Sequence, residues 1–537
     1  MKSVNEITVT DTAYFKLTRT CDNLICRPDA PSSIVAIPWL HVINEVPFML
    51  SVYSDVLPVV ETQNHKIPQS NPFISVRDQN RGAVFYFAQF VKSFIRSFYF
   101  RDSRLITASA PEKPFLPDLD MTRVDVLIVT WLLNRDHLEK ISDFYFGELQ
   151  QLLLNRGLSS LLLMRNQSGY HSHELQQQTL RKGSTGRLLL PDTQSPGAEL
   201  GYLRKGLELR RYFRKHRFEG YSEFEKRLFQ KASEFSVLSP GIQNLRLHDQ
   251  IEIICRRFEP SIVVTLYEGH AWERCVWHAA REANPETLCV GYQHTILRKH
   301  SHALRRSLHP LRKGYDPNLI LTLGSVTQKM LEKSMQLPNI SKMIYGTHRR
   351  FNSRIKFEEP KSTTTFLVLP EGVESESMYL FNIALACAPH LPDVRFIFRM
   401  HPVLLFDDVR PLLKGYPPKT GNVEVSDNPD PEEDFARSGY ILYRGSSTVI
   451  YAILAGLKPY YFERPNEMNF DPIFELTVWR ERVRSTDELI RKFKADQKTS
   501  PDLRSRQWTE ALTYCDQYTR SVREETLDWM IAHSVSN

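Results

Sequence analysis

The 537-residue chain lacks the long apolar runs that mark membrane-spanning proteins. A helix that crosses a bilayer needs about 20 consecutive apolar residues, and no such run occurs. The first residues, Met1–Glu6, also lack the apolar stretch of a secretory signal peptide. These absences predict a cytoplasmic protein without a membrane-spanning helix.

Cysteines are few and scattered, and only Cys21 and Cys26 of the seven lie close together in sequence. No pair of histidines at metal-ligand spacing accompanies them. The pattern therefore predicts neither a disulfide framework nor a zinc site, and the thiols are expected to stay reduced. We expect no metal.

The chain also lacks a strong excess of either charge, because 69 basic residues against 62 acidic residues give a formal net charge of only +7. This balance suits acidic ligands but does not indicate nucleic acid as a partner. Two local basic runs remain. The run at 204–217 predicts a helix whose basic face meets either solvent or the inner face of the plasma membrane. The run at 298–313 predicts either a solvated loop or a mobile cationic loop over a ligand cleft.

What the sequence does contain is an alternation of short apolar strands and amphipathic helices. Strands are expected at 34–37, 124–131, 161–164, 188–191, 261–266, 288–290, 317–323, 365–369, 394–399, 440–443 and 458–462. Helices are expected at 141–156, 204–217, 270–282, 326–334, 375–388, 448–455 and 503–531.

This alternation predicts an α/β protein with parallel sheets and helices on both faces. We expect two Rossmann-like domains facing a central cleft, one at 1–345 and one at 363–537, joined by a linker at 346–362. Ligands of such folds bind at the carboxyl ends of the strands.

The second half carries two motifs at such strand ends, Arg399-Met-His-Pro402 and Arg444-Gly-Ser-Ser-Thr448. No P-loop sequence occurs. Backbone N–H groups and hydroxyls at a helix start bind phosphate oxygens without a metal, although ordinary helix capping is the alternative. Proline restricts the preceding histidine to extended geometry, which directs its side chain out of the loop. The residues expected to bind an activated sugar are Arg399, His401, Pro402, Arg444, Gly445, Ser446, Ser447, Thr448, Glu371 and Gly372.

The first half supplies candidates for proton transfer and for acceptor binding. Glu268 follows a strand, Glu273 lies further along the next helix, and His294 has the same topological position on the following strand. A carboxylate there could deprotonate an acceptor hydroxyl, whereas the alternative for Glu268 is to cap the helix. His41, Asn44 and Glu45 follow the first expected strand and are candidates for acceptor contact, with local capping as the alternative.

The pairs His401-Pro402 and Ser446-Ser447, in that order and 45 positions apart, resemble the donor-binding motifs of bacterial sialyltransferases. Related bacterial transferases of 3-deoxy-octulosonic acid share them. The resemblance implies the GT-B fold and a CMP-activated acidic sugar, with His401 at the CMP phosphate and both serines at its oxygens. The sialyltransferase base lies in an acidic pair followed by glycine, whereas Tyr267-Glu268-Gly269 keeps one acid.

The segments 267–273 and 291–295 also resemble surface-carbohydrate biosynthesis proteins found with O-antigen genes. Together the resemblances imply a metal-independent glycosyltransferase with no cofactor beyond its nucleotide-sugar donor. Its partners would be that donor and a glycan or glycolipid acceptor of lipopolysaccharide or capsule. A CDP-polyol phosphotransferase of the teichoic-acid type and a non-catalytic scaffold of polysaccharide assembly are the alternatives.

Overall fold

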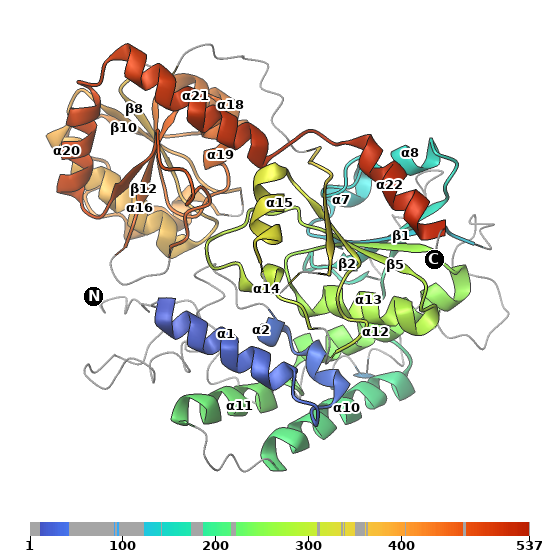
Figure 1. The fold of residues 1–537 in the computed structure, drawn as a ribbon. Helices are drawn as coiled ribbons and strands as arrows, with labels where there is room; N and C mark the ends of the chain where they lie inside the picture. Colours follow the sequence, from blue (N-terminus) through green and yellow to red (C-terminus); the bar gives the residue numbers. More distant parts are fainter. Residues whose placement is uncertain are drawn as a thin grey trace.

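A computed structural model describes most of the chain. The described residues are 11–41, 91, 94–95, 123–140, 142–172, 175, 186–215, 222–308, 312–334, 337, 339–348, 360, 363–402, 404–464 and 469–535. The fold is built from two separate parallel sheets, each flanked by helices (Figure 1). The expected α/β architecture with two Rossmann-like sheets is thereby confirmed.

The first sheet has the strand order β3-β2-β1-β4-β5-β6-β7, and every neighbouring pair is parallel. Its strands are β1 (Val126–Leu132), β2 (Ser160–Asn166), β3 (Gly186–Leu189), β4 (Ile262–Leu266), β5 (Leu288–Tyr292), β6 (Leu319–Thr322) and β7 (Ser341–Ile344). β1 and β4 are the central pair, and almost all their residues are buried because helices cover both faces.

The second sheet has the order β10-β9-β8-β11-β12-β13 and is also parallel throughout. Its strands are β8 (Thr365–Leu369), β9 (Arg395–Phe398), β10 (Val423–Val425), β11 (Tyr440–Tyr443), β12 (Lys458–Phe462) and β13 (Glu481–Val483). The division of the chain at 346–362 falls between β7 and β8 and stays a prediction.

The helices connect the strands and form an additional layer beside the first sheet (Figure 1). The α-helices are α1 (Asp11–Ile25), α2 (Pro38–His41), α7 (Asp136–Glu139), α8 (Leu149–Leu154), α10 (Pro196–Lys215), α11 (Glu223–Phe235), α12 (Ser239–Phe258), α13 (Ala271–Ala283), α14 (His302–Arg305), α15 (Ser325–Glu332), α16 (Glu374–Cys387), α17 (Phe406–Val409), α18 (Pro431–Arg437), α19 (Val449–Leu454), α20 (Thr486–Asp496), α21 (Pro501–Tyr518) and α22 (Glu524–Val535). Three 3-10 helices are η1 (Ser32–Ala36), η4 (Ala388–His390) and η5 (Arg410–Leu412).

The additional helical layer has its own hydrophobic core. Tyr14 and Leu17 of α1, Tyr202 of α10 and Leu228 of α11 belong to one buried cluster. Among the described residues, no β-strand contributes to this cluster, which also includes residues of η1, α12 and α13. In this layer α10 and α11 pack against each other and against α12.

The strand expected at 34–37 is wrong, because this segment belongs to η1. Ile34, Val35 and Ala36 are buried, but they pack against helices instead of pairing with a strand. A four-residue apolar run has no periodicity that separates strand from helix. Prolines at 31 and 38 bound it on both sides and favour a short helical turn.

The helix expected at 141–156 is also wrong over its first half, since α8 covers only six residues. Upstream, Gly147 has a φ of +57° and forms an isolated bridge with Asp143. The Asp143 carboxylate accepts the N–H groups of Tyr145 and Phe146 (2.8 and 2.7 Å) and stabilises this turn. Such local side-chain bonds compete with helix formation.

The single helix expected at 503–531 is two helices, α21 and α22. Between them the Arg520 N–H donates to the Leu323 carbonyl (2.8 Å), and the Arg520 carbonyl accepts the Thr347 N–H (2.8 Å). The break lets α22 pack beside the first sheet, where Asp528 pairs with Arg156 in the loop between α8 and β2 (2.6 Å). The helix expected at 448–455 is confirmed, and Gly456 ends it with a φ of +87°.

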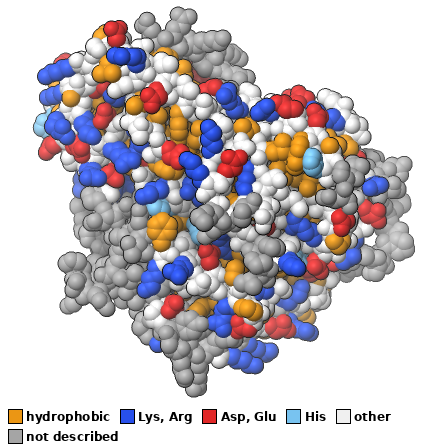
Figure 2. Space-filling model, in the orientation of Figure 1, with side chains coloured by type: hydrophobic (Ala, Val, Ile, Leu, Met, Phe, Trp, Pro, Cys, Tyr) orange, Lys and Arg blue, Asp and Glu red, His pale blue; other side chains and the backbone are white. Residues whose placement is uncertain are grey.

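Among the described helices, none combines the length and apolarity needed to cross a bilayer. Figure 2 shows Lys and Arg side chains spread over both halves of the visible face and interspersed with acidic ones. The modest net charge is thus distributed rather than concentrated on this face.

Candidate active site

Polar side chains gather where β4 and β5 of the first sheet end. The parallel register of these strands places Glu268 and His294 side by side, each two residues beyond its strand. Glu268 Oε1 lies 3.1 Å from His294 Nε2, and Glu268 Oε2 lies 2.8 Å from His270 Nε2. The structure therefore brings two of the expected residues together and adds His270, which the sequence reasoning missed. We refer to these three residues as the His–Glu–His cluster.

The charges of the cluster stabilise one another. Burial alone would raise the pKa of Glu268, but its contacts with His270 and His294 outweigh burial and hold that pKa well below its ordinary value. Burial lowers the pKa of His270, but its hydrogen bond with Glu268 and the nearby Glu273 carboxylate together more than reverse this effect, so the His270 pKa lies above 6.5. A carboxylate that stays ionised between two imidazoles can orient them and stabilise the imidazolium that forms when one accepts a proton.

Aromatic rings enclose part of the cluster. The Trp131 ring at the end of β1 lies 5.3 Å from that of His270, and the Tyr145 ring meets that of His294 edge-on at 4.8 Å. His294 is 6% exposed, whereas the Glu268 side chain keeps 21% of its surface in solvent. Electrostatic interactions are stronger in such partly dry surroundings.

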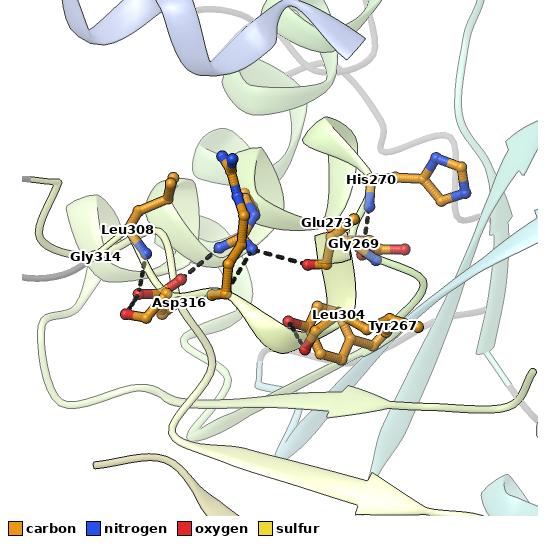
Figure 3. A network of polar contacts seen from close by, with 12 residues as sticks. Tyr267, Gly269, His270, Glu273, Leu304, Leu308, Gly314 and Asp316 are labelled. Atoms are coloured by element: carbon orange, nitrogen blue, oxygen red, sulfur yellow. Dashed lines mark hydrogen bonds and ion pairs between the residues drawn. The ribbon is translucent and has the colours of Figure 1, made fainter. Parts of the chain in front are cut away.

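Glu273, also expected to be catalytic, is occupied by the backbone of the preceding loop. Its carboxylate accepts the N–H groups of Glu268, Gly269 and His270, each at 2.9 Å. Figure 3 shows Glu273 beside Gly269 and His270. The side chain is fully buried at the first turn of α13. Because both oxygens accept backbone N–H groups, we assign Glu273 to positioning this loop and not to proton transfer.

Gly269 is required by the same loop. Its φ is +87°, and a Cβ there would lie 2.5 Å from the backbone of Ala303. We expect Gly269→Ala to destabilise the protein by more than the roughly 1–2 kcal/mol that the left-handed conformation alone costs a non-glycine residue. Gly157→Ala is the matched control, since Gly157 has a φ of +76° and nothing within 4 Å of the added Cβ. Urea unfolding of both variants measures the difference, and equal losses would show that contact with Ala303 has no effect.

The basic run at 298–313 is not a mobile loop in its described part, so that expectation is wrong. Asp22 of α1 pairs with His302 (2.8 Å) and with Arg306. Arg312 donates to a backbone carbonyl at the end of α1 (3.0 Å). These cations therefore bind the run to α1 and leave it little freedom, which charge counting along the sequence cannot foresee.

A second row of polar residues lies at the ends of β8, β9 and β11. The parallel register places Glu371, His401 and Gly445 at the same level beyond their strands, with Glu371 in the middle. Neighbouring strands lie about 4.8 Å apart, so the backbones at 401 and 445 are roughly 10 Å apart. Side chains on both flanks of Glu371 can thus reach one ligand of nucleotide size.

The loops around this row are tightly turned. At Gly372 the Val373 N–H donates to the Glu371 carbonyl (2.8 Å). His401, which Pro402 follows, is half-buried, and burial lowers its pKa below 6.5, which keeps the imidazole neutral at pH 7. A neutral imidazole can donate one hydrogen bond and accept another.

Ser446, Ser447 and Thr448 occupy the turn between β11 and α19. Ser447 is exposed, whereas Ser446 and Thr448 are half-buried. Thr448 is the N-cap residue of α19, but its side chain makes no capping hydrogen bond. The Thr448 side chain therefore does not cap α19.

Arg399 and Arg444, expected among the donor-binding residues, are tied to buried carboxylates. Arg444 is 2% exposed, and its Nη1 lies 2.9 Å from both oxygens of Glu376. Arg399 Nη1 lies 2.6 Å from Asp434 Oδ2. Both guanidinium groups stabilise the loops that carry the site, and we do not count them as ligand contacts.

Arg298 reaches the second row from the loop that follows His294, and the sequence reasoning did not single it out within its basic run. Its Nη2 lies 3.2 Å from the Gly445 carbonyl oxygen and 3.7 Å from Glu371 Oε1. The signal that could have found it is its position four residues after His294, on a loop leaving a strand end. For His270, the corresponding signal is a histidine placed directly after Glu268-Gly269 at a helix start.

Of the expected acceptor contacts, His41 is the last residue of α2, while Asn44 and Glu45 lie outside the described residues. Their contact with an acceptor stays a prediction.

One group of described side chains has the composition of a metal site. Ligand atoms of His248, Asp249 and Glu252 on α12 lie within 4.8 Å of one another. Arg256 pairs with Glu252 at 2.8 Å, and Lys205 lies 3.8 Å from Asp249, so cations already balance both carboxylates. The group lies in the middle of α12, a helix that contributes no residue to either polar row.

No protein-family model matches the chain, and no curated protein matches it in sequence. Solved structures do align along most of its length. The glycotransferase of kitacinnamycin and the trehalose-6-phosphate synthase OtsA each align with 76% of this chain and 99% of their own, at 11% identity and a TM-score of 0.44. UDP-GlcNAc 2-epimerase from Neisseria meningitidis aligns with 77% of this chain and 100% of its own, at 11% identity and a TM-score of 0.38.

The fold is GT-B-like. This conclusion follows from the two parallel sheets themselves. Similarities at this level of identity do not extend to substrate or reaction.

Proposed function

We propose that the protein is a glycosyltransferase that moves an acidic sugar, of the nonulosonic or 3-deoxy-octulosonic type, from CMP to a surface glycan. The acceptor would be a lipopolysaccharide, O-antigen or capsule chain. The observation that carries the proposal is a short segment, 294–298, that starts in the row with proton-accepting groups and ends at the row with hydroxyls and a neutral imidazole. His294 contacts Glu268 in the first row, and Arg298 contacts Gly445 and Glu371 in the second.

The His–Glu–His cluster suits the acceptor side of this reaction. The acceptor oxygen forms a bond to the anomeric carbon while its proton passes to an imidazole of the cluster. The bond between the anomeric carbon and the CMP phosphate oxygen breaks, and CMP leaves with the electron pair. Glu268 holds the imidazoles in place and stabilises the added positive charge.

The second row suits the donor side. Ser446, Ser447 and Thr448 offer hydroxyls to phosphate oxygens, and His401 offers an imidazole N–H from the far side of Glu371. Carboxylates at strand ends of Rossmann-like units accept hydrogen bonds from ribose hydroxyls, and Glu371 has this position. The CMP-linked acidic donor is favoured by the His-Pro and Ser-Ser motifs.

Nucleotide binding is the first test. Thermal unfolding is measured with CMP, CDP, CDP-glycerol and UDP, since a ligand that binds only the native state raises the unfolding temperature. CMP release is then followed with CMP-sialic acid and CMP-3-deoxy-octulosonic acid in the presence of glycan acceptors. Stabilisation by CMP with release of CMP supports the proposal. Selective stabilisation by CDP-glycerol favours polyol-phosphate transfer, and no response to any nucleotide favours a scaffold.

The rate should depend on pH through His270. Because the His270 pKa is raised above 6.5, this imidazole is protonated at lower pH and cannot then accept a proton. We expect kcat/KM for CMP release to fall about tenfold per pH unit below an apparent pKa that is higher than 6.5. In His270→Asn the position of this limb should change. An unchanged limb in that variant, or one centred below 6.5, would contradict the assignment.

A further inference from the structure

A single short stretch of chain, 294–298, contacts both polar rows. At its beginning, His294 meets Glu268 of the first sheet at 3.1 Å. At its end, Arg298 reaches the Gly445 carbonyl at 3.2 Å and Glu371 at 3.7 Å, both in loops of the second sheet. Only three residues separate these two contacts along the chain.

The segment 294–298 is held in place by the end of α21. The Tyr518 hydroxyl at the end of α21 accepts the Leu297 N–H (2.8 Å) and donates to the Leu297 carbonyl (3.1 Å). The Arg298 N–H donates to Ser301 Oγ (2.8 Å). The backbone of Arg298 is thus fixed on both sides, and its side chain has a defined direction toward the second sheet.

The surroundings of the guanidinium group suit an anionic ligand. The Arg298 and Glu371 side chains are each 13% exposed, and a Cβ at Gly445 would overlap the Glu371 carboxylate. The Glu371 carboxylate, so close to the 445–448 turn, would repel a phosphate if no cation balanced it. Arg298 lies within ion-pair distance of Glu371. Its planar fork can contact a phosphate as well as this carboxylate.

We propose that Arg298 binds the phosphate of the nucleotide donor and thereby couples donor binding to the position of His294. This inference rests on the proposed function. When the donor phosphate enters at Ser446 and Ser447, Arg298 exchanges the Gly445 carbonyl for a phosphate oxygen. His294 lies 3.1 Å from Glu268 before the donor enters, and the pull on Arg298 is passed along the segment 294–298 to His294, which makes proton transfer faster in the occupied enzyme.

The test compares CMP affinity in the full-length protein and its variants by isothermal titration calorimetry. Arg298→Gln should weaken CMP binding about 10- to 100-fold, because a hydrogen bond from a charged group to phosphate is lost. Arg298→Lys should lie between this variant and the wild type. Lys299→Gln removes an exposed neighbouring charge and should leave the affinity unchanged. Wild-type affinity in Arg298→Gln would overturn the inference, whereas absence of CMP binding by the wild type would instead refute the proposed function.

A double variant separates ligand contact from mere charge balance. If Arg298 only neutralises Glu371, then Arg298→Gln combined with Glu371→Gln should recover the CMP affinity of Glu371→Gln alone. If Arg298 contacts the phosphate, the double variant should stay at least about tenfold weaker than Glu371→Gln. Tyr518→Phe reports on the coupling, because it frees Leu297 without touching either row. We expect it to lower kcat with little change in CMP affinity, and an unchanged kcat would refute the coupling.

Discussion

Glu268→Gln is expected to reduce the rate of CMP release by about 10²- to 10⁴-fold, the usual range for losing acid–base catalysis. The amide keeps the shape of the carboxylate but carries no charge and has one acceptor oxygen instead of two. It can therefore accept a hydrogen bond from only one of His270 and His294, and it cannot stabilise the imidazolium that forms. Initial rates of CMP release at saturating donor, measured beside the unfolding temperature, test this expectation.

Two comparisons make the result specific to the cluster. Glu282→Gln changes an exposed acid at the far end of α13 and should leave the rate unchanged. Glu273→Gln should lower the unfolding temperature, because it replaces a carboxylate oxygen that accepts backbone N–H groups with an NH₂ group that cannot. A fully active Glu268→Gln variant would remove this residue from the mechanism.

The largest expected loss of stability comes from the buried ion pair behind the donor loop. Glu376→Ala removes the carboxylate whose two oxygens lie 2.9 Å from Nη1 of Arg444, a residue that is 2% exposed. Removing one partner of a buried pair costs about 3–5 kcal/mol, because the remaining charge stays desolvated. Denaturant unfolding of the variant measures the loss.

Glu374→Ala is the matched control, since Glu374 is exposed in the same first turn of α16. It should change the free energy of unfolding by less than about 1 kcal/mol. Because Arg444 immediately precedes Gly445, Glu376→Ala should also weaken CMP binding, whereas Glu374→Ala should not. Equal effects of the two substitutions would show that the pair does not stabilise the loop.

The sequence predicts most strands well where both faces of a parallel sheet are covered. The strands expected at 261–266, 365–369, 440–443 and 458–462 are found within one residue of their bounds. Three of them are apolar runs with β-branched residues, and the strand at 458–462 is mostly aromatic, patterns that need no tertiary information. The expected helix at 270–282 is confirmed for the same reason, since Trp272, Val276 and Ala279 form one buried face.

Helix α12, in contrast, was not predicted although it has 20 residues. Its buried face is interrupted by polar side chains that have distant partners. Asn244 donates to the Ala36 carbonyl (3.0 Å), and Arg246 pairs with Glu199 of α10 (2.6 Å). Asn244 and Arg246 stand at buried positions of α12, where an amphipathic helix usually has apolar residues. Periodicity along the sequence therefore does not reveal the helix.

The site residues also divide into those that the sequence predicts and those whose roles depend on distant partners. Topology alone predicts that Glu268 and His294 lie at neighbouring strand ends, because β4 and β5 follow each other along the chain and pair in register. The contacts of Arg399 and Arg444 depend on Asp434 and Glu376, which are tens of positions away. No local pattern encodes those partners, so a conspicuous arginine beside a motif can equally be part of the scaffold.

The two passages of the chain between the sheets, after β7 and after α21, touch one another. The Thr347 N–H donates to the Arg520 carbonyl, and a Cβ at Gly346 would overlap the carbonyl of Ser521. Because the two connections adjoin, a relative rotation of the halves disturbs the chain least when its axis passes near this contact. Cutting the chain in 519–523 would remove one of the two connections and with it this preference.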